Sequence, residues 1–215
     1  VFFAIVAGMK GHYVQASRSI FVAAALDTAD GRVASLTNTE SDFGKEYDSL
    51  SDVVAFGVAP ALVAFSWGLS TLGQIGWVVA FIYIACGALR LARFNTKEES
   101  NNFIGLASPA AACLMGCCIW VWSEFVGGPV TVGAASIMAG ALLLSGLLMV
   151  SNFLYYSPKQ TAIRDRVPFI SLVLVIFTFS IILLEPSLVL LFIGVSYALS
   201  GPFSYLWKKT KVTEN

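Results

Sequence analysis

The chain has 215 residues, of which 57% are hydrophobic and only 12% are charged. Such a composition lies far outside the range of soluble domains, so it predicts a membrane protein that crosses the bilayer several times, as a single domain over residues 1–215. The formal net charge is zero, and nothing in it indicates nucleic acid as a partner.

Long apolar runs predict the helices. A helix needs roughly 20 apolar residues to span a bilayer. In chain order, the runs predict eight helices at about 1–9, 14–36, 42–67, 72–94, 104–126, 130–152, 168–185 and 187–207, the first as the truncated end of a span. Three prolines, Pro60, Pro109 and Pro202, lie within these ranges and are expected to bend their helices. The expected fold is an all-α membrane bundle.

Lysine and arginine predict the orientation. If the helices alternate strictly, eleven of the 13 basic residues lie on the same side as Lys45, and only Lys10 and Arg18 lie on the other. Basic residues concentrate on the cytoplasmic side of membrane proteins, so we expect the segment 27–52 to face the cytoplasm. The single histidine, His12, falls on the outer side. Trp67, Trp77, Trp122 and Trp207 lie near predicted helix ends, where tryptophan anchors proteins at the membrane interface.

Four aspartates fall inside this apolar chain, two on the second predicted helix and two on the third. Helical spacing puts them on one face of each helix, together with small residues: Asp27, Asp30, Gly31 and Ala34 on the second, and Gly44, Asp48, Ser51 and Asp52 on the third. A short turn makes the helices antiparallel, so the four carboxylates can converge at similar depth. Carboxylates at membrane depth need a compensating partner, and hard divalent cations prefer oxygen ligands. The spacing therefore predicts a metal site.

Other interpretations of the same residues stay open at this point. Gly31, Ala34 and Gly44 could be small residues that let helices pack closely. The four aspartates could line a pathway for protons or cations, as in a metal or proton transporter. Spacing alone does not decide between transport and catalysis.

The pattern as a whole resembles the signature of the CDP-alcohol phosphotransferase family, D-x2-D-G-x2-A-R-x8-G-x3-D-x3-D. Seven of its eight positions are present with every gap of the right length; at the eighth, Ser35 stands where the family has arginine. The runs YDSLSDVVAFGVAPALVAF, ALRLARFNT and FIGLASPAAA are similar to the bacterial phosphatidylserine synthases of the integral-membrane type, a branch of this family. The resemblance covers at least residues 20–112.

The resemblance implies a six-helix catalytic core in a homodimer of the bacterial inner membrane, surrounded by membrane lipids, with its active site facing the cytoplasm. The implied substrates are CDP-diacylglycerol and L-serine, and the products are phosphatidylserine and CMP. Asp27, Asp30 and Asp48 would hold Mg²⁺ or Mn²⁺, as two ions, and Asp52 would both face the metals and act as general base. The residues implied for binding the nucleotide of CDP-diacylglycerol are Asp30, Gly31, Arg32, Ala34, Gly44 and Ser51.

The sequence departs from the family signature at position 35. Serine at position 35 cannot replace the several N–H donors of an arginine guanidinium, although Arg32, one turn earlier, would compensate in part.

Arg90, Arg93 and Asn95 at the end of the fourth predicted helix are candidates for binding the substrate serine, because a guanidinium binds a carboxylate in a bidentate way. The two arginines could equally be anchors on the cytoplasmic side. A sister enzyme that uses glycerol 3-phosphate or an inositol phosphate remains an alternative.

Overall fold

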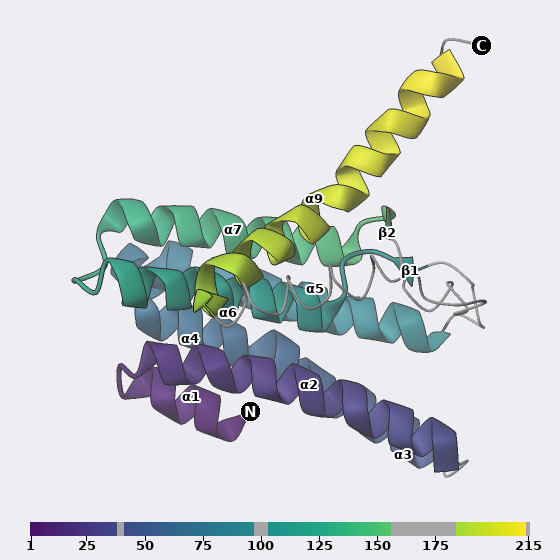
Figure 1. The fold of residues 1–215 in the computed structure, drawn as a ribbon, viewed down its shortest axis with the longest axis horizontal. Helices are drawn as coiled ribbons and strands as arrows, with labels where there is room; N and C mark the ends of the chain where they lie inside the picture. Colours follow the sequence, from purple (N-terminus) through teal and green to yellow (C-terminus); the bar gives the residue numbers. More distant parts are fainter. Residues whose placement is uncertain (38–40, 97–102, 156–183, 214–215) are drawn as a thin grey trace.

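The structure is a computed structural model that describes residues 1–37, 41–96, 103–155 and 184–213. Within these ranges the chain forms a bundle of helices joined by short turns (Figure 1). In chain order the elements are α1 (Phe2–Met9), α2 (Tyr13–Thr37), α3 (Asp42–Asp52), the π-helical turn η1 (Val53–Val58), α4 (Ala59–Trp67), the 3-10 turn η2 (Leu69–Leu72), α5 (Gln74–Thr96), β1 (Phe103–Ile104), α6 (Ser108–Phe125), α7 (Val132–Val150), β2 (Leu154–Tyr155) and α9 (Pro186–Thr213).

Four of the described helical segments are long and apolar enough to cross a membrane: Glu46–Trp67, Gln74–Thr96, Val132–Val150 and Pro186–Tyr205. Their outer faces carry large apolar side chains, such as Ile137 and Phe192, which are 77% and 75% exposed. Apolar surface of this kind is stable against lipid and costly against water. The expectation of an all-α membrane bundle is confirmed. Residues 168–183 of the helix expected at 168–185 lie outside the described residues, so the number of eight remains a prediction.

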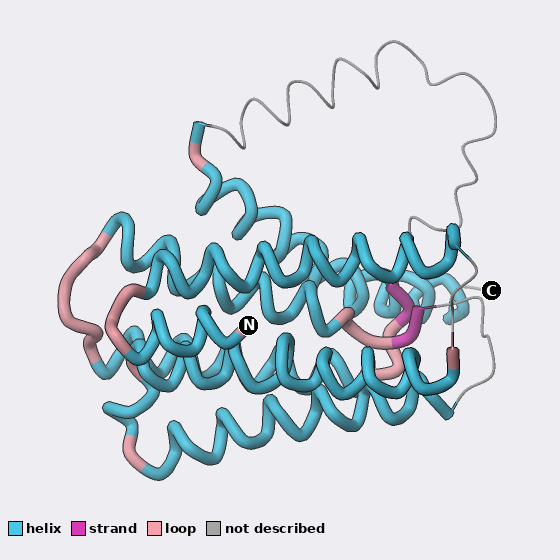
Figure 2. Tube along the Cα trace, turned by 90° about the horizontal axis from the view of Figure 1, so that it is seen from below, coloured by secondary structure: helices cyan, strands magenta, loops and turns pink. Residues whose placement is uncertain are grey.

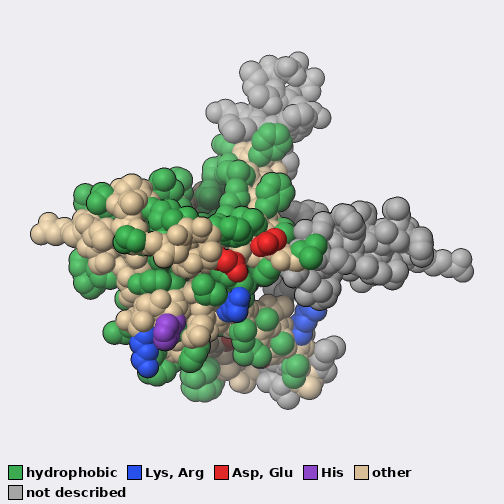
Figure 3. All heavy atoms as spheres, turned by 60° about the vertical axis from the view of Figure 1, so that its left-hand side comes forward, with side chains coloured by type: hydrophobic (Ala, Val, Ile, Leu, Met, Phe, Trp, Pro, Cys, Tyr) green, Lys and Arg blue, Asp and Glu red, His purple; other side chains and the backbone are tan. Residues whose placement is uncertain are grey.

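The bundle has two distinct ends (Figures 1 and 2). One end holds the last turns of α2, α5 and α7 and the start of α3, and we call it the acidic end because the aspartates lie there. The opposite end holds the α1–α2 turn, η2 and the α6–α7 turn, and it is turned toward the viewer in Figure 3, where hydrophobic side chains cover much of the surface. Between the two ends, α5 packs on α7, α2 on α6, and α6 on α9. Buried side chains of Tyr83, Met115 and Leu142 form part of the core.

The range 42–67 was expected to form one helix, and it is continuous but not uniform. Ser41 caps its start, because its Oγ accepts a hydrogen bond of 3.0 Å from the amide of Gly44. Directly after Asp52, the chain widens into the π-helical turn η1 before α4 continues. Pro60, four residues after Phe56, has no N–H to donate to the carbonyl of Phe56. This carbonyl instead accepts a hydrogen bond of 3.0 Å from the buried hydroxyl of Tyr83.

The helix expected at 104–126 begins later, at Ser108, and the expectation that Pro109 bends it was wrong. Pro109 lies in the first turn of α6, where the missing N–H costs nothing. The chain before α6 is extended, and its N-cap Ala107 has β-region backbone angles. In this segment β1 pairs antiparallel with β2, and the amide of Gly105 donates to the carbonyl of Phe153 over 2.9 Å. Pro60 also lies in a first turn, whereas Pro202 lies inside α9.

Candidate metal and active site

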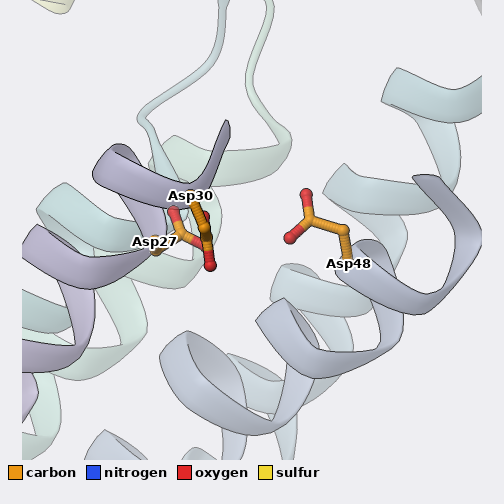
Figure 4. Close-up of side chains that lie close together, drawn as sticks. All are labelled: Asp27, Asp30 and Asp48. Carbon is orange, nitrogen blue, oxygen red and sulfur yellow. The ribbon is translucent and has the colours of Figure 1, made fainter. Parts of the chain in front are cut away.

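Three aspartates converge at the acidic end. Asp27 and Asp30 project from α2 and Asp48 projects toward them from α3 (Figure 4). One carboxylate oxygen from each residue lies within 4.8 Å of the other two. Oxygens on opposite sides of an octahedral Mg²⁺ are about 4.2 Å apart, because each bond is about 2.1 Å long. Asp27 is half-buried and the other two are exposed. The cluster therefore fits a hard divalent cation and remains accessible to a substrate.

The fourth aspartate lies beside this cluster rather than within it. Asp52 is half-buried, and its carboxyl group lies close to that of Asp27. It also interacts electrostatically with the guanidinium of Arg90. Carboxylates that are this close repel one another unless a cation or a proton lies between them. Asp52 thus interacts both with a member of the acid cluster and with a buried arginine.

Small residues leave space beside the cluster. A side chain added at Gly31 would meet no atom within 4 Å, and one added at Gly44 would meet only the Oγ of Ser41 at 3.1 Å. Arg32 and Ser51 are exposed on the same two helices, and the Ser51 hydroxyl donates to the carbonyl of Asp48 over 2.9 Å. Ala34 and Ser35 lie on α2, but their side chains are outside the described part of the structure.

Arg90 is a buried basic residue that interacts with Asp52. It is only 9% exposed, and its Nη1 donates to the hydroxyl of Ser108 on α6 over 2.9 Å. Tyr197 of α9 lies close enough to interact with its charge. The Nε of Arg90 is buried and has no hydrogen-bond partner among the described residues. A buried donor without a partner is costly, so this atom would gain from an acceptor.

Arg93 and Asn95 hold other elements together. Arg93 donates to the carbonyl of Val150 at the end of α7 over 3.3 Å, and to the Oδ1 of Asn152 over 2.6 Å. Asn95 donates to the hydroxyl of Ser49 on α3 over 2.9 Å. Arg93 thus contacts the end of α7 and Arg90 contacts α6, although both arginines lie on the last turns of α5.

Two residues near Arg90 were missed in the sequence. Ser108 lies within the run FIGLASPAAA, which was noted only for its similarity to other proteins. Tyr197 lies on α9, more than 100 residues from Arg90 along the chain. Nothing in the local pattern of either residue connects it to the aspartates, because only packing of α6 and α9 against the bundle brings them there.

An apolar helix bundle with converging carboxylates at one end defines a membrane protein with a site for a cation. Comparison of the sequence with known families gives the class a name. The sequence model of the CDP-alcohol phosphatidyltransferase family matches residues 1–156, and the chain belongs to this family. The family uses divalent metals, in agreement with the acid cluster.

Several relatives of this chain share one name. The CDP-diacylglycerol–serine O-phosphatidyltransferase of Helicobacter pylori strain J99 is 35% identical over 94% of this chain and 84% of its own length. The protein of the same name from Methanocaldococcus jannaschii is 41% identical over 70% of this chain and 68% of its own. That from Bacillus subtilis is 39% identical over 59% and 69%.

Proposed function

We propose that this protein transfers the phosphatidyl group of CDP-diacylglycerol to the hydroxyl of L-serine, which gives phosphatidylserine and CMP. The observation that carries the proposal is the convergence of Asp27, Asp30 and Asp48 from two helices at one end of an apolar bundle. The name shared by the relatives, one of which matches 94% of the chain, supports serine as the acceptor.

Asp27, Asp30 and Asp48 would hold two divalent ions, Mg²⁺ or Mn²⁺, with Asp52 facing them from the side. Such ions, when bound, neutralise charge on the pyrophosphate and stabilise the departing CMP. Oxygen-only ligands favour both metals over zinc or copper, which are commonly bound through nitrogen or sulfur. The proximity of Asp52 to Asp27 supports a role for Asp52 next to the ions.

Asp52 is the proposed general base. It accepts the proton of the serine hydroxyl while that oxygen forms a bond to the phosphorus that carries the diacylglycerol. The bond from this phosphorus to the bridging oxygen breaks, and CMP leaves with the electron pair. A positioned carboxylate base contributes about 10²- to 10⁴-fold to such a step. No covalent intermediate on the protein is required.

The surroundings of the aspartates suit the rest of the substrates. The free space at Gly31 and Gly44 lets a nucleotide approach the backbone of α2 and α3 closely. Asp30, Arg32, Ala34 and Ser51 line the same part of the two helices and complete the proposed nucleotide site. Arg90 would bind the serine carboxylate through its free Nε. Because Arg90 lies beside Asp52, the amino acid would then present its hydroxyl to the base.

The proposed setting is the bacterial inner membrane, with the acidic end on the cytoplasmic side, where serine is available. Arg32, Arg90 and Arg93 lie at that end, as the positive-inside rule requires of a cytoplasmic surface. We further propose that the protein acts as a homodimer, as the resemblance implies.

The test is the release of CMP from CDP-diacylglycerol by the purified protein, measured with and without serine and with Mg²⁺, Mn²⁺ or EDTA. We expect release to require both serine and a divalent metal. Asp52→Asn should lower kcat by about 10²- to 10⁴-fold and leave binding of CDP-diacylglycerol nearly unchanged, since the side chains are equal in size. Turnover without serine or in EDTA would overturn the mechanism.

The same assay separates the alternatives. A sister enzyme would transfer the phosphatidyl group to labelled glycerol 3-phosphate or inositol phosphate and not to labelled serine. A metal or proton transporter would give ion flux in proteoliposomes without release of CMP.

A further inference from the structure

A serine begins α6, but it does not cap the helix. Ser108 is only 1% exposed and follows Ala107, which occupies the N-cap position. A serine or threonine at the start of a helix normally accepts a hydrogen bond from an amide of the first turn. Ser41 of α3 and Thr131 of α7 do so. Within the described residues no amide of α6 donates to the hydroxyl of Ser108, so capping does not explain why a hydroxyl is buried here.

The hydroxyl of Ser108 instead holds a charged side chain from another helix. Its Oγ accepts the hydrogen bond of 2.9 Å from Nη1 of Arg90 on α5. This is the one hydrogen bond that Arg90 makes within the described part of the chain. A hydrogen bond from a charged donor is stronger than one between neutral groups. Because an arginine side chain has many rotamers, this bond restricts where the guanidinium lies.

The backbone that carries Ser108 is also held in place. The amide of Leu106 donates to the carbonyl of Leu148 over 3.0 Å, next to the pairing of β1 with β2. Gly105 has a φ of +83°, and a Cβ there would collide with the carbonyl oxygen of Met149. Only glycine allows this close approach of the two backbones. The start of α6 is therefore anchored to the end of α7, and Ser108 offers Arg90 a fixed acceptor.

A neutral partner holds Arg90 without neutralising it. A carboxylate in the place of the Ser108 hydroxyl would compensate the charge of the guanidinium, whereas a hydroxyl supplies only an acceptor. Arg90 is attracted to Asp52, but no hydrogen bond joins the two among the described residues. The bond to Ser108 opposes movement of the guanidinium onto the proposed base. The positive charge is thus kept for an anionic group of a substrate.

We propose that Ser108 is a positioning residue for the acceptor substrate: its hydroxyl holds the guanidinium of Arg90 in the orientation that binds the carboxylate of the amino acid. This inference rests on the proposed function, in which Arg90 binds that carboxylate. Ser108 acts through Arg90 and touches neither substrate. It therefore sets the KM for serine and leaves the proposed nucleotide site on α2 and α3 unchanged.

The test is the initial rate of CMP release by the purified full chain with Mg²⁺ or Mn²⁺, at varied serine and at varied CDP-diacylglycerol. Ser108→Ala should raise the KM for serine about tenfold, equivalent to about 1.4 kcal/mol. Its kcat and its KM for CDP-diacylglycerol should stay close to those of the wild type. Ser108→Cys, similar in size but a weak acceptor, should also raise the KM for serine, whereas Ser108→Thr keeps the hydroxyl and should restore it.

Ser145→Ala is the matched control. Ser145 is a serine of α7 that is 2% exposed, and its hydroxyl donates within its own helix, to the carbonyl of Ala141 over 2.8 Å. Removing this hydroxyl disturbs a buried site without touching Arg90, so the KM for serine should equal that of the wild type.

A double variant separates positioning from a purely structural role. In the Arg90→Ala background, Ser108→Ala should raise the KM for serine no further, because Ser108 acts through Arg90. A further rise in the double variant would overturn the inference. So would an unchanged KM for serine in Ser108→Ala, or an equal rise in the KM for both substrates, while the wild type still requires serine. CMP release by the wild type without serine would overturn the proposed function itself, and this inference with it.

Discussion

Arg90 and Arg93 are one turn apart on α5, yet their surroundings differ. Arg90 is buried next to Asp52, with one donor on Ser108 and its Nε free among the described residues. Arg93 donates hydrogen bonds to the carbonyl of Val150 and to the side chain of Asn152, at the end of α7. In the sequence the two arginines had equal weight as serine ligands, because both end a predicted helix on the same side. Their hydrogen bonds favour Arg90 as the residue that binds the serine substrate, and Arg93 as a residue that holds α5 against α7.

We therefore expect Arg90→Ala to raise the KM for serine about ten- to hundredfold, which corresponds to the loss of a charge-assisted hydrogen bond of about 1.5–3 kcal/mol. Arg90→Lys should also raise this KM, because lysine keeps the charge but lacks the planar fork. The matched variant Arg93→Ala should lower the melting temperature and change the KM for serine much less. Initial rates of CMP release at varied serine give both constants, and an unchanged KM in Arg90→Ala would rule out this role.

Position 35, a serine, is the one position where this sequence departs from the family signature. An arginine there would add a fixed positive charge and several donors next to the proposed nucleotide site. We expect Ser35→Arg to retain or raise CMP release, mainly through a lower KM for CDP-diacylglycerol. Ser35→Ala serves as the control for simple loss of the hydroxyl. A large fall in activity with arginine would mean that α2 approaches the nucleotide differently in this protein.

At the scale of elements, the π-helical turn η1 positions the base. It begins directly after Asp52 and ends where Pro60 enters the first turn of α4. The hydrogen bond from Tyr83 to the carbonyl of Phe56 fastens this turn to α5, the helix that also carries Arg90. The chain thus links the proposed base and the proposed serine ligand through one buried contact. Hydrophobic pattern predicted the helix 42–67 but not this turn, since a π turn leaves the apolar run unbroken.

Removing that contact should affect both stability and rate. Tyr83→Phe leaves the carbonyl of Phe56 buried without its partner, at a cost of about 1–3 kcal/mol. For a chain of this size we expect a loss of roughly 2–12 °C in melting temperature, at about 2–4 °C per kcal/mol. CMP release should fall, but by less than in Asp52→Asn. Tyr205→Phe, at an exposed tyrosine on α9, is the control and should change neither.

At the scale of the whole molecule, the two ends of the bundle differ in chemistry. The acidic end gathers the aspartates together with Arg32, Arg90 and Arg93, whereas the opposite end carries Lys10 and Arg18. Because basic residues remain on the cytoplasmic side during insertion, this asymmetry predicts the orientation.

Orientation can be measured with cysteines at the two ends. In a variant without its four native cysteines, Lys10→Cys should react with a membrane-impermeant maleimide in intact spheroplasts. Thr96→Cys, exposed at the last turn of α5, should react only after the membrane is opened. The reverse pattern would place the acidic end outside the cytoplasm and contradict the proposed orientation.

The sequence by itself determined that the chain is a helical membrane bundle, that Asp27, Asp30 and Asp48 come together, and to which family the chain belongs, because these depend on local regularities. A run of about 20 apolar residues predicts a span, and steps of three and four along a helix put Asp27 beside Asp30. The tertiary structure alone decided which arginine interacts with Asp52 and how Ser108 and Tyr197 join it. Each depends on contacts between helices distant in the chain, and such contacts leave no periodic pattern in any one helix.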